Sequence, residues 1–342
     1  MRRVTKIAAA GIATAALALT ATACGESSTE SGGKDKGVGL AFDVGGRDDH
    51  SFNESAARGV DKAQEDLGVG AKMLTAKNNE TEADREQRLT SLAEAGYNPV
   101  IGVGFNYGKS IAKVAKDFPK TTFAVVDSVS PGKNVDSIVF SEHEGSYLAG
   151  VAAALKSKTG KVGFIGGVNN ALIQKFQAGF EQGAKDTKKN VQVTSEYLYA
   201  NNDKGFNDPA AAKEKAKGML DRNIDVIYSA AGQSGAGSIE AIAGKKGAWA
   251  IGVDSDQYQQ PGLAKYKNSI LTSVVKNVDV AVFDVVKSVK DGKPLTGVHA
   301  YTLKQNGVSL ATSGGFIDAI KGQVDAAKKK IADGEIKVKD TP

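Results

Sequence analysis

The sequence is poor in the side chains that most often build covalent cross-links and metal sites. Its 342 residues include one cysteine and three histidines. One cysteine excludes an internal disulfide framework, and so few cysteines and histidines leave little material for a zinc site. We therefore expect no metal and no other cofactor, and composition points to no catalytic residue.

The chain also lacks a strong excess of charge of either sign. Its formal net charge is +5, and setting aside the three positive charges of Arg2, Arg3 and Lys6 leaves +2, because no acidic residue precedes Glu26. This nearly equal number of positive and negative charges argues against a nucleic-acid partner. A hydrophobic content of 41% and a charged content of 24% are ordinary for a soluble globular protein, and the length suits two domains.

The hydrophobic run near the N-terminus is too short for a transmembrane helix. Ile7–Thr20 is rich in alanine and follows a basic segment, as in the signal peptide of an exported protein. The sequence that follows, Ala21-Thr22-Ala23-Cys24, resembles the lipobox of bacterial lipoproteins, although alanine stands where leucine is favoured.

These features predict a lipoprotein signal peptide over residues 1–23 and acylation of Cys24. Residues 24–36 are polar and rich in Ser, Gly and Lys, which is typical of a flexible tether. The protein would then be held by lipid at the extracytoplasmic face of the cell membrane. The alternative is an ordinary secretory signal with a chance cysteine.

From Gly37 onward, short apolar strands alternate with amphipathic helices. The first half predicts strands at 38–42, 71–75, 99–103, 122–126 and 137–140, with helices at 53–67, 81–95 and 107–117. After a helix at 146–156, the second half predicts strands at 161–165, 191–198, 224–229 and 249–253, with helices at 170–185, 209–221 and 236–243. Strands joined by crossover helices indicate parallel sheets with both faces covered.

The C-terminal part does not continue this alternation. It predicts a strand at 269–275, a helix at 278–290 that ends at Gly292-Lys293-Pro294, extended pieces near 298–304 and 308–311, and a last amphipathic helix. Eight strands could form a single barrel, but this C-terminal part favours a chain that passes between two lobes. We expect hinges near 141–146, 255–270 and 292–297. The expected lobes are 37–143 plus 274–293, and 144–273 plus 294–342.

The segment Val38–Gly59 brings several functional signals together. A strand ends at Asp43, the loop that follows contains Gly45-Gly46 and Asp48-Asp49, and Ser51 with Glu54 fits the capping box of a helix. Phe52 and Asn53 then open that helix. Because ligands bind beyond the carboxyl ends of the strands in an open α/β sheet, we predict a binding site here.

Polar side chains also follow other predicted strands. The residues at these strand ends are Asp43, Gly104-Phe105-Asn106, Asp127, Gly166-Gly167, Ala230-Ala231-Gly232 and Asp254. Three carboxylates at strand ends exceed what sheet packing requires. Carboxylates accept strong hydrogen bonds from hydroxyl and ring N–H donors, which favours a neutral, polyhydroxylated ligand. Lys276 would add a donor.

An aromatic face is expected beside these carboxylates. Phe52 is the first choice, and Tyr228 is the second, with Phe176 and Phe206 as alternatives. Stacking on an aromatic ring is worth about 1–3 kcal/mol per nucleic-acid base.

Simpler structural roles remain open for the same residues. Asp43 and Asp127 could cap the turns that follow them, and Asn53 could bond to the backbone. Asp48 and Asp49 fit solvated loop charges or cation pairs better than ligand contacts. Lys276 could pair with Asp279 on its own helix face.

Several segments in order resemble the basic membrane protein family of bacterial lipoproteins, whose best understood members are purine nucleoside receptors of ABC importers. They are Val38–Gly59, Gly102–Phe105, Phe123–Asp127, Ala230–Gly232, Gly252–Gln257 (GVDSDQ) and Thr272–Lys276, and the resemblance extends from about Gly37 to Phe316. It implies a two-lobed type I periplasmic binding protein fold, α/β, with three crossover hinges. It also implies a nucleoside ligand, with purine favoured, and ABC permease subunits as partners.

The resemblance further implies roles for individual residues. Asp43 and Asp127 would bind the base edge, and Phe52 with a second aromatic residue would enclose the base. Asp254 and Lys276 would hold the ribose hydroxyls, helped by the glycine loop at Gly232.

Other functions are alternatives to a nucleoside receptor. A receptor for a sugar or another small polar ligand would use the same side chains, and a nucleoside-hydrolysing enzyme also uses strand-end aspartates. A nicotinamide-dependent oxidoreductase is disfavoured because Gly232, Gly235 and Gly237 form GxxGxG, the wrong order for a dinucleotide fingerprint. A signalling receptor remains a minor alternative. We expect a binding protein rather than an enzyme.

Overall fold

The computed structural model describes residues 36–77 and 79–342. The predicted signal peptide (1–23) and Cys24 lie outside these residues, and the predicted tether (24–36) is described only at Lys36. Within the described ranges, no helix has both the length and the apolar character needed to span a membrane.

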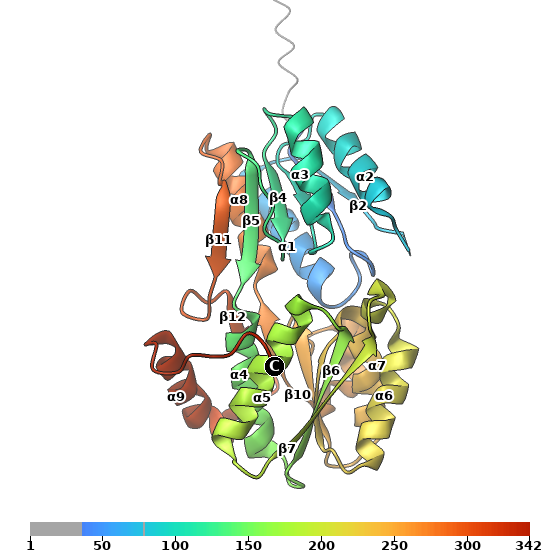
Figure 1. Ribbon diagram of the computed structural model, residues 1–342, viewed down its shortest axis with the longest axis vertical. Helices are drawn as coiled ribbons and strands as arrows, with labels where there is room; N and C mark the ends of the chain where they lie inside the picture. Colours follow the sequence, from blue (N-terminus) through green and yellow to red (C-terminus); the bar gives the residue numbers. More distant parts are fainter. Residues whose placement is uncertain (1–35, 78) are drawn as a thin grey trace, which may run out of the picture. The chain divides into compact units, whose positions relative to one another are not determined.

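The first lobe is built on a six-stranded sheet with the strand order β11-β5-β4-β3-β1-β2 (Figure 1). Its strands are β1 (Val38–Ala41), β2 (Ala71–Leu74), β3 (Val100–Gly102), β4 (Phe123–Val126), β5 (Val135–Phe140) and β11 (Gly297–Tyr301). Each neighbouring pair is parallel. Helices α1 (Phe52–Leu67) and α8 (Val278–Lys290) pack together on one face, and α2 (Glu82–Glu94) and α3 (Tyr107–Asp117) on the other.

The second lobe repeats this plan with the strand order β12-β10-β9-β8-β6-β7. Its strands are β6 (Lys161–Val168), β7 (Gln192–Tyr199), β8 (Val226–Ala230), β9 (Trp249–Asp254), β10 (Ile270–Lys276) and β12 (Val308–Leu310). Only β12 in this described sheet is antiparallel to its neighbour.

Helices cover both faces of the second sheet as well. The pair α4 (Glu142–Lys156) and α5 (Ala171–Thr187) lies on one face, and the pair α6 (Pro209–Asp221) and α7 (Gly235–Ala243) on the other. Helix α9 (Lys321–Ala332) packs against α4. Short 3-10 segments complete the lobe: η1 (Asp203–Phe206), η2 (Gly232–Ser234), η3 (Pro261–Ser269) and η4 (Asp318–Ile320).

The sequence explains why the central strands are buried on both sides. All four residues of β4 (FAVV) are fully buried. Successive side chains point to opposite faces of a strand, so Leu40 joins the core beneath α1 and α8 while Ala41 joins the core beneath α2 and α3. The predicted fold class, two parallel-sheet lobes flanked by helices, is confirmed.

The described chain passes between the lobes at three places. These are Ser141, between β5 and α4; Asn277, between β10 and α8; and residues 302–307, between β11 and β12. The hinge expected near 141–146 agrees with the first. The hinges expected at 255–270 and 292–297 are wrong, because 255–270 joins β9 to β10 inside the second lobe and 292–297 joins α8 to β11 inside the first.

The expected lobe limits differ from the observed sheets for the same reason. Strand β11 (Gly297–Tyr301) pairs with β5 in the first sheet, whereas residues 294–342 were expected in the second lobe. A short strand carries no sequence signal for which of two sheets it joins, and only pairing decides this.

Candidate functional site

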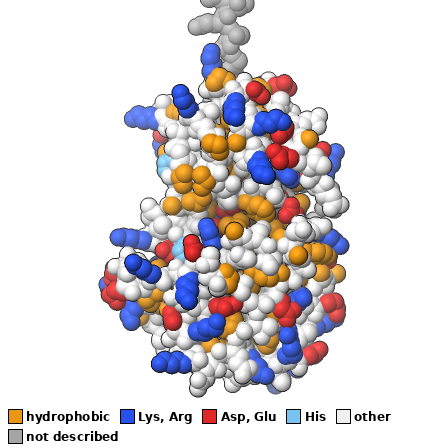
Figure 2. Space-filling model, in the orientation of Figure 1, with side chains coloured by type: hydrophobic (Ala, Val, Ile, Leu, Met, Phe, Trp, Pro, Cys, Tyr) orange, Lys and Arg blue, Asp and Glu red, His pale blue; other side chains and the backbone are white. Residues whose placement is uncertain are grey.

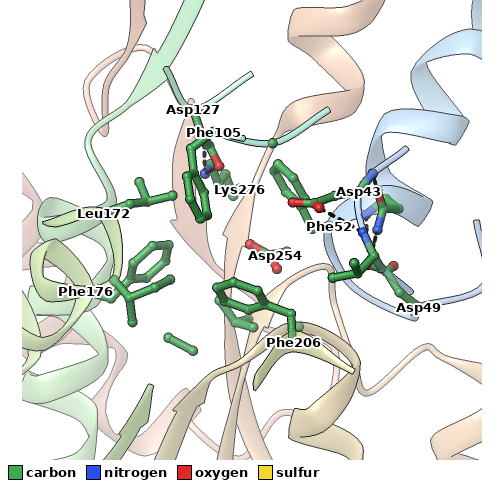
Figure 3. Close-up of a pocket in the computed structure, with 17 residues that line it drawn as sticks. Asp43, Asp49, Phe52, Phe105, Asp127, Leu172, Phe176, Phe206, Asp254 and Lys276 are labelled. Atoms are coloured by element: carbon green, nitrogen blue, oxygen red, sulfur yellow. Dashed lines mark hydrogen bonds and ion pairs between the residues drawn. The ribbon is translucent and has the colours of Figure 1, made fainter. Parts of the chain in front are cut away.

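A cavity lies between the carboxyl ends of the two sheets. It encloses about 560 Å³ of empty space, counting the part open to solvent. Figure 3 shows side chains from both lobes converging on it. Its lining comprises Asp43, Val44, Asp49, Phe52, Asn53, Gly104, Phe105, Asp127, Leu172, Ile173, Phe176, Phe206, Ala230, Gly232, Val253, Asp254 and Lys276.

Asp43 follows β1 and reaches the cavity from the first lobe. Its Oδ1 accepts a hydrogen bond from the backbone N–H of Val44 at 2.8 Å. Its Oδ2 lies over Gly104, where a Cβ would approach it to 2.4 Å, so a side chain at position 104 would displace this carboxylate. Burial raises the pKa of Asp43 to about 7.

Asp49 was expected to be a solvated loop charge, and this is wrong. Its side chain is 3% exposed and accepts hydrogen bonds from the backbone N–H groups of Ser51, Asn53 and Glu54 at 2.8–3.1 Å. Burial raises the pKa of Asp49 to about 6 despite these bonds. Asp49 therefore satisfies the free N–H groups at the start of α1.

The predicted capping box at Ser51 is accordingly wrong. The Ser51 side chain makes no capping hydrogen bond to α1. Its Oγ instead donates to Asp254 Oδ2 at 2.6 Å, in the opposite lobe. The local motif cannot reveal this alternative, because the acceptor lies about 200 residues away in the chain.

Asn53 is 1% exposed, and its amide is occupied by the protein. Its Oδ1 accepts from the backbone N–H of Asp43, and its Nδ2 donates to the carbonyl of Val44 and to Asp49 Oδ2, at 2.9–3.1 Å. These bonds fix the loop that presents Asp43. Asn53 lines the cavity, but both of its donor hydrogens are already used.

Lys276 ends β10 and is 2% exposed. Its Nζ lies 2.6 Å from both carboxylate oxygens of Asp127 and 3.1 Å from Glu142 Oε1. Burial opposes its charge, but the carboxylates of Asp127, Glu142 and Asp254 outweigh that effect and raise the pKa of Lys276. We call Lys276, Asp127 and Glu142 the lysine cluster.

Asp127 and Asp254 share an unusual backbone conformation. Their φ angles are 70° and 62°, in the left-handed region that aspartate tolerates better than most residues. Such strained positions gather at functional sites. Burial raises the pKa of Asp254 to about 6, while Lys276 and the Ser51 hydroxyl act in the opposite direction.

Four phenylalanine rings supply apolar faces to the cavity: Phe52 and Phe105 from the first lobe, and Phe176 and Phe206 from the second. The Nζ of Lys276 lies 5.1 Å from the ring centre of Phe52 and 5.8 Å from that of Phe176. Phe206 contacts Phe105 edge to face, with ring centres 6.5 Å apart.

Tyr228, the second predicted aromatic face, does not reach the cavity. It is fully buried in the core of the second lobe, with its ring 5.5 Å from those of Phe164 and Phe180 and its hydroxyl 3.3 Å from Ser146 Oγ. Alternation along β8 places its side chain in the core, whereas the cavity is reached at the strand end by Ala230 and Gly232.

Gly232 lines the cavity as predicted, at the start of η2. Its φ is 54°, and a Cβ there would lie 3.2 Å from the carbonyl oxygen of Phe206. A glycine at this position lets the loop pass close to Phe206.

The two lobes also touch beside the cavity. The Nδ2 of Asn106 donates to Asp203 Oδ2 at 2.7 Å, next to the contact between Phe105 and Phe206. In Figure 2, hydrophobic side chains gather in the indentation between the lobes, while acidic and basic side chains are interspersed over the rest of this face.

Sequence reasoning missed three contributors. Glu142 is 1% exposed within the lysine cluster, and Leu172 and Ile173 line the apolar wall. Glu142 lies directly after the first crossing and inside the hinge expected at 141–146, but its role depends on Lys276, which is distant in the sequence. The two aliphatic residues open α5 and carry no signal that separates them from core residues.

The arrangement combines hydrogen-bond acceptors, one ammonium group and aromatic faces. Among residues 36–77 and 79–342, no group of three or more His, Cys, Asp or Glu side chains is placed to hold a metal ion. The site is therefore suited to binding an uncharged polar molecule with a flat apolar part.

Comparisons with known proteins agree with this geometry. Residues 36–342 match the model of the family described as "ABC transporter substrate-binding protein PnrA-like". The chain is 35% identical over 343 residues to the CD4+ T-cell-stimulating antigen of Listeria innocua, covering 94% of both. It is also 35% identical over 353 residues to the ABC transporter nucleoside-binding protein BmpA of Lactococcus lactis, covering 97% of this chain and 98% of the relative.

A solved structure shows the same architecture. A solute-binding protein of an ABC transporter system from Aeropyrum pernix K1 superimposes with a TM-score of 0.75 at 28% identity, over 88% of this chain and 92% of that one. The predicted two-lobed binding-protein fold is thereby confirmed.

Proposed function

This chain belongs to the family of PnrA-like ABC transporter substrate-binding proteins, and from that premise we propose that its cavity binds a nucleoside, with a purine favoured. The resemblance to the basic membrane protein family is confirmed. Because this family consists of substrate-binding proteins rather than enzymes, the nucleosidase and oxidoreductase alternatives are set aside.

The observation that carries the proposal is the division of the cavity into two chemically different ends. At one end, Lys276 lies between Asp127 and Glu142, with Asp254 also acting on its charge. At the other end, Asp43 has no ion-pair partner among the described residues. The phenylalanine rings lie between and around these groups (Figure 3).

The lysine-cluster end suits a ribose. Each ribose hydroxyl both donates and accepts a hydrogen bond, so neighbouring carboxylate and ammonium groups can satisfy a pair of them. We therefore assign Asp127, Asp254 and Lys276 to the ribose. This differs from the expectation that Asp127 binds the base edge, because both of its oxygens face Lys276.

The other end suits a base. Asp43 presents a hydrogen-bond acceptor to the base edge, and Phe52 stacks on one face of the ring. We propose Phe206 as the second stacking residue in place of Tyr228. It comes from the opposite lobe, and Asp203, at the start of the same η1 segment, acts on the charge of Asp43.

The test is calorimetry and thermal shift against adenosine, guanosine, inosine, uridine, cytidine, free bases, ribose and hexoses. We expect nucleosides to bind. Phe52→Ala should weaken them by about 5- to 150-fold, the cost of roughly 1–3 kcal/mol of stacking, while weak binding of free ribose changes little.

The matched control is Phe283→Ala. The Phe283 ring also lies 5.1 Å from a lysine Nζ, that of Lys62, and it packs on the same lobe outside the cavity. Equal losses for nucleoside and ribose in Phe52→Ala would exclude stacking, and binding of hexoses alone would favour the sugar-receptor alternative.

The location and partners follow from the same premise. We propose that Cys24 is acylated and anchors the protein to the cell membrane at its extracytoplasmic face, and that the ligand-bound protein delivers its nucleoside to ABC permease subunits. Cys24→Ala should release the protein from the membrane fraction, and retention of this variant would contradict the anchor.

A further inference from the structure

The negative charge of Asp43 is stabilised less than that of the other aspartates that line the cavity. Asp127 faces Lys276, Asp254 accepts from a serine hydroxyl, and Asp49 accepts from three backbone N–H groups. Asp43 accepts one bond on Oδ1, and within residues 36–77 and 79–342 its Oδ2 has no hydrogen-bond or ion-pair partner. Figure 3 shows this carboxylate directed into the cavity.

The charges around Asp43 act in opposite directions on its ionisation. Burial is the largest influence and favours the protonated acid. Arg85 of α2 favours the carboxylate, while Asp203 of η1 and Asp127 after β4 oppose it. Asp49 lies beyond Asn53, and Asp254 and Lys276 act from the β9–β10 side of the cavity.

One further titratable group contacts this region from α3. The Tyr107 hydroxyl donates to the carbonyl of Phe42, and burial raises the pKa of this phenol to about 12, so it remains neutral. With the pKa of Asp43 itself raised to about 7, both forms of its side chain are populated near neutral pH.

The two forms offer different hydrogen-bonding patterns. An ionised carboxylate only accepts, whereas a protonated carboxyl group has one donor and one acceptor. The guanine edge presents two adjacent donors, N1–H and the 2-amino group, which match the carboxylate, and its acceptor O6 beside N1–H also matches the protonated acid. The adenine edge presents a donor, the 6-amino group, beside the acceptor N1, and it matches the protonated acid.

We propose that Asp43 selects among purine nucleosides through its protonation state, so that the protonated form binds both adenosine and guanosine, whereas the ionised form favours guanosine over adenosine. This inference rests on the proposed nucleoside function. Hypoxanthine lacks the 2-amino group and presents N1–H beside the acceptor O6, which the protonated acid satisfies twice and the carboxylate once, so inosine should follow adenosine rather than guanosine.

The experiment is isothermal titration calorimetry of the whole protein with adenosine, guanosine and inosine across neutral pH. For a group titrating at about pH 7, raising the pH from about 5.5 to about 8 should weaken adenosine about tenfold while guanosine changes little, so the ratio of guanosine to adenosine affinity should rise about tenfold, following the population of the protonated form. The ratio of the two affinities isolates Asp43, because groups that contact the ribose act equally on both ligands.

Asp43→Asn provides the variant test. An amide keeps one donor and one acceptor at every pH, so adenosine should bind without pH dependence and the ratio of the guanosine and adenosine affinities should stay constant with pH. Asp48→Asn is the matched control, since it removes an exposed carboxylate from the same loop outside the cavity. In this control, the pH-dependent ratio should persist.

The outcomes separate the two proposals. If no nucleoside binds, the proposed function fails. If adenosine and guanosine bind with a ratio that stays constant with pH in the unmodified protein, the selection by Asp43 is overturned while the nucleoside function stands. The measurement on the unmodified protein decides this even if Asp43→Asn does not fold.

Discussion

Both ends of the cavity contain carboxylates, but ion pairs stabilise them at one end and a backbone hydrogen bond at the other. At the lysine cluster, Lys276 is 2% exposed and lies within ion-pair distance of Asp127 and Glu142. At the other end, Asp43 relies on one backbone N–H and on a loop fixed by Asn53. The lysine cluster therefore depends on charge balance for the stability of the fold, whereas the Asp43 end leaves a carboxylate available to recognise the ligand.

The largest expected effect comes from removing the positive charge at the first end. Lys276→Met leaves buried carboxylates without a counter-charge and should lower the free energy of unfolding by about 3–5 kcal/mol. Urea denaturation near neutral pH measures this. By contrast, Asp43→Asn should cost little stability, because the amide oxygen of the new side chain can still accept the hydrogen bond from the Val44 N–H.

A control for the first variant is Lys287→Met, which removes an exposed lysine paired with Asp291. Exposed pairs contribute about 0–1 kcal/mol. If Lys276→Met lowered the free energy of unfolding no more than this control does, the lysine cluster would not stabilise the fold. The contrast between the two ends of the cavity would then be wrong.

An intermediate effect is expected at Asp49, which holds the loop that presents Asp43. Asp49→Ala removes the acceptor for three N–H groups at the start of α1 and should cost about 2 kcal/mol of stability. It should also weaken ligand binding, because the loop that carries Asp43 loses its support.

Asp48→Ala is the neighbouring comparison for this prediction. Asp48 is exposed and should be neutral to within about 0.5 kcal/mol. Chemical denaturation of both variants distinguishes a buried cap from a solvated loop charge, and equal losses would restore the original expectation that both aspartates are solvated.

The smallest expected effect concerns the contact between the lobes near the Asp43 end. Asn106→Ala removes the bond to Asp203 and should speed ligand dissociation about two- to tenfold, matching the loss of roughly 0.5–1.5 kcal/mol for one hydrogen bond. Stopped-flow displacement measures this rate. Lys109→Ala, an exposed change on α3, should leave it unaltered, and a similar rate in both variants would mean that the bond does not restrain the lobes.

Much of the fold could be predicted from the sequence because its signals are local. Apolar runs such as β4 and helical periodicity in α6 depend on neighbouring residues, so the predicted helix 209–221 coincides with α6 (Pro209–Asp221). The crossing at 302–307 was missed because which sheet accepts β11 is decided by pairing with β5, far away in the chain. The crossing at Asn277 lies close to the expected lobe limit at 273/274.

The same distinction between local and long-range signals applies to the residues of the candidate site. Asp43, Phe52, Asp127, Gly232, Asp254 and Lys276 were predicted from strand ends and family motifs, and the structure brings them to one cavity. Tyr228 was misplaced because a one-residue difference in position along a strand reverses the direction of its side chain. Glu142 was missed because its significance depends on the position of Lys276.

The strands, the helices, the family and the side chains that follow the strand ends could be read from the sequence, since each is encoded in short stretches of chain. How those side chains share their charges became known from the three-dimensional arrangement alone. Lys276 neutralises Asp127 rather than pairing with Asp279, Ser51 bonds to the opposite lobe, and Asp43 has no ion-pair partner within the part of the chain that the structure describes. Burial and ion pairing depend on distances through space, and the contact between Lys276 and Asp127 brings together residues more than a hundred positions apart in the chain.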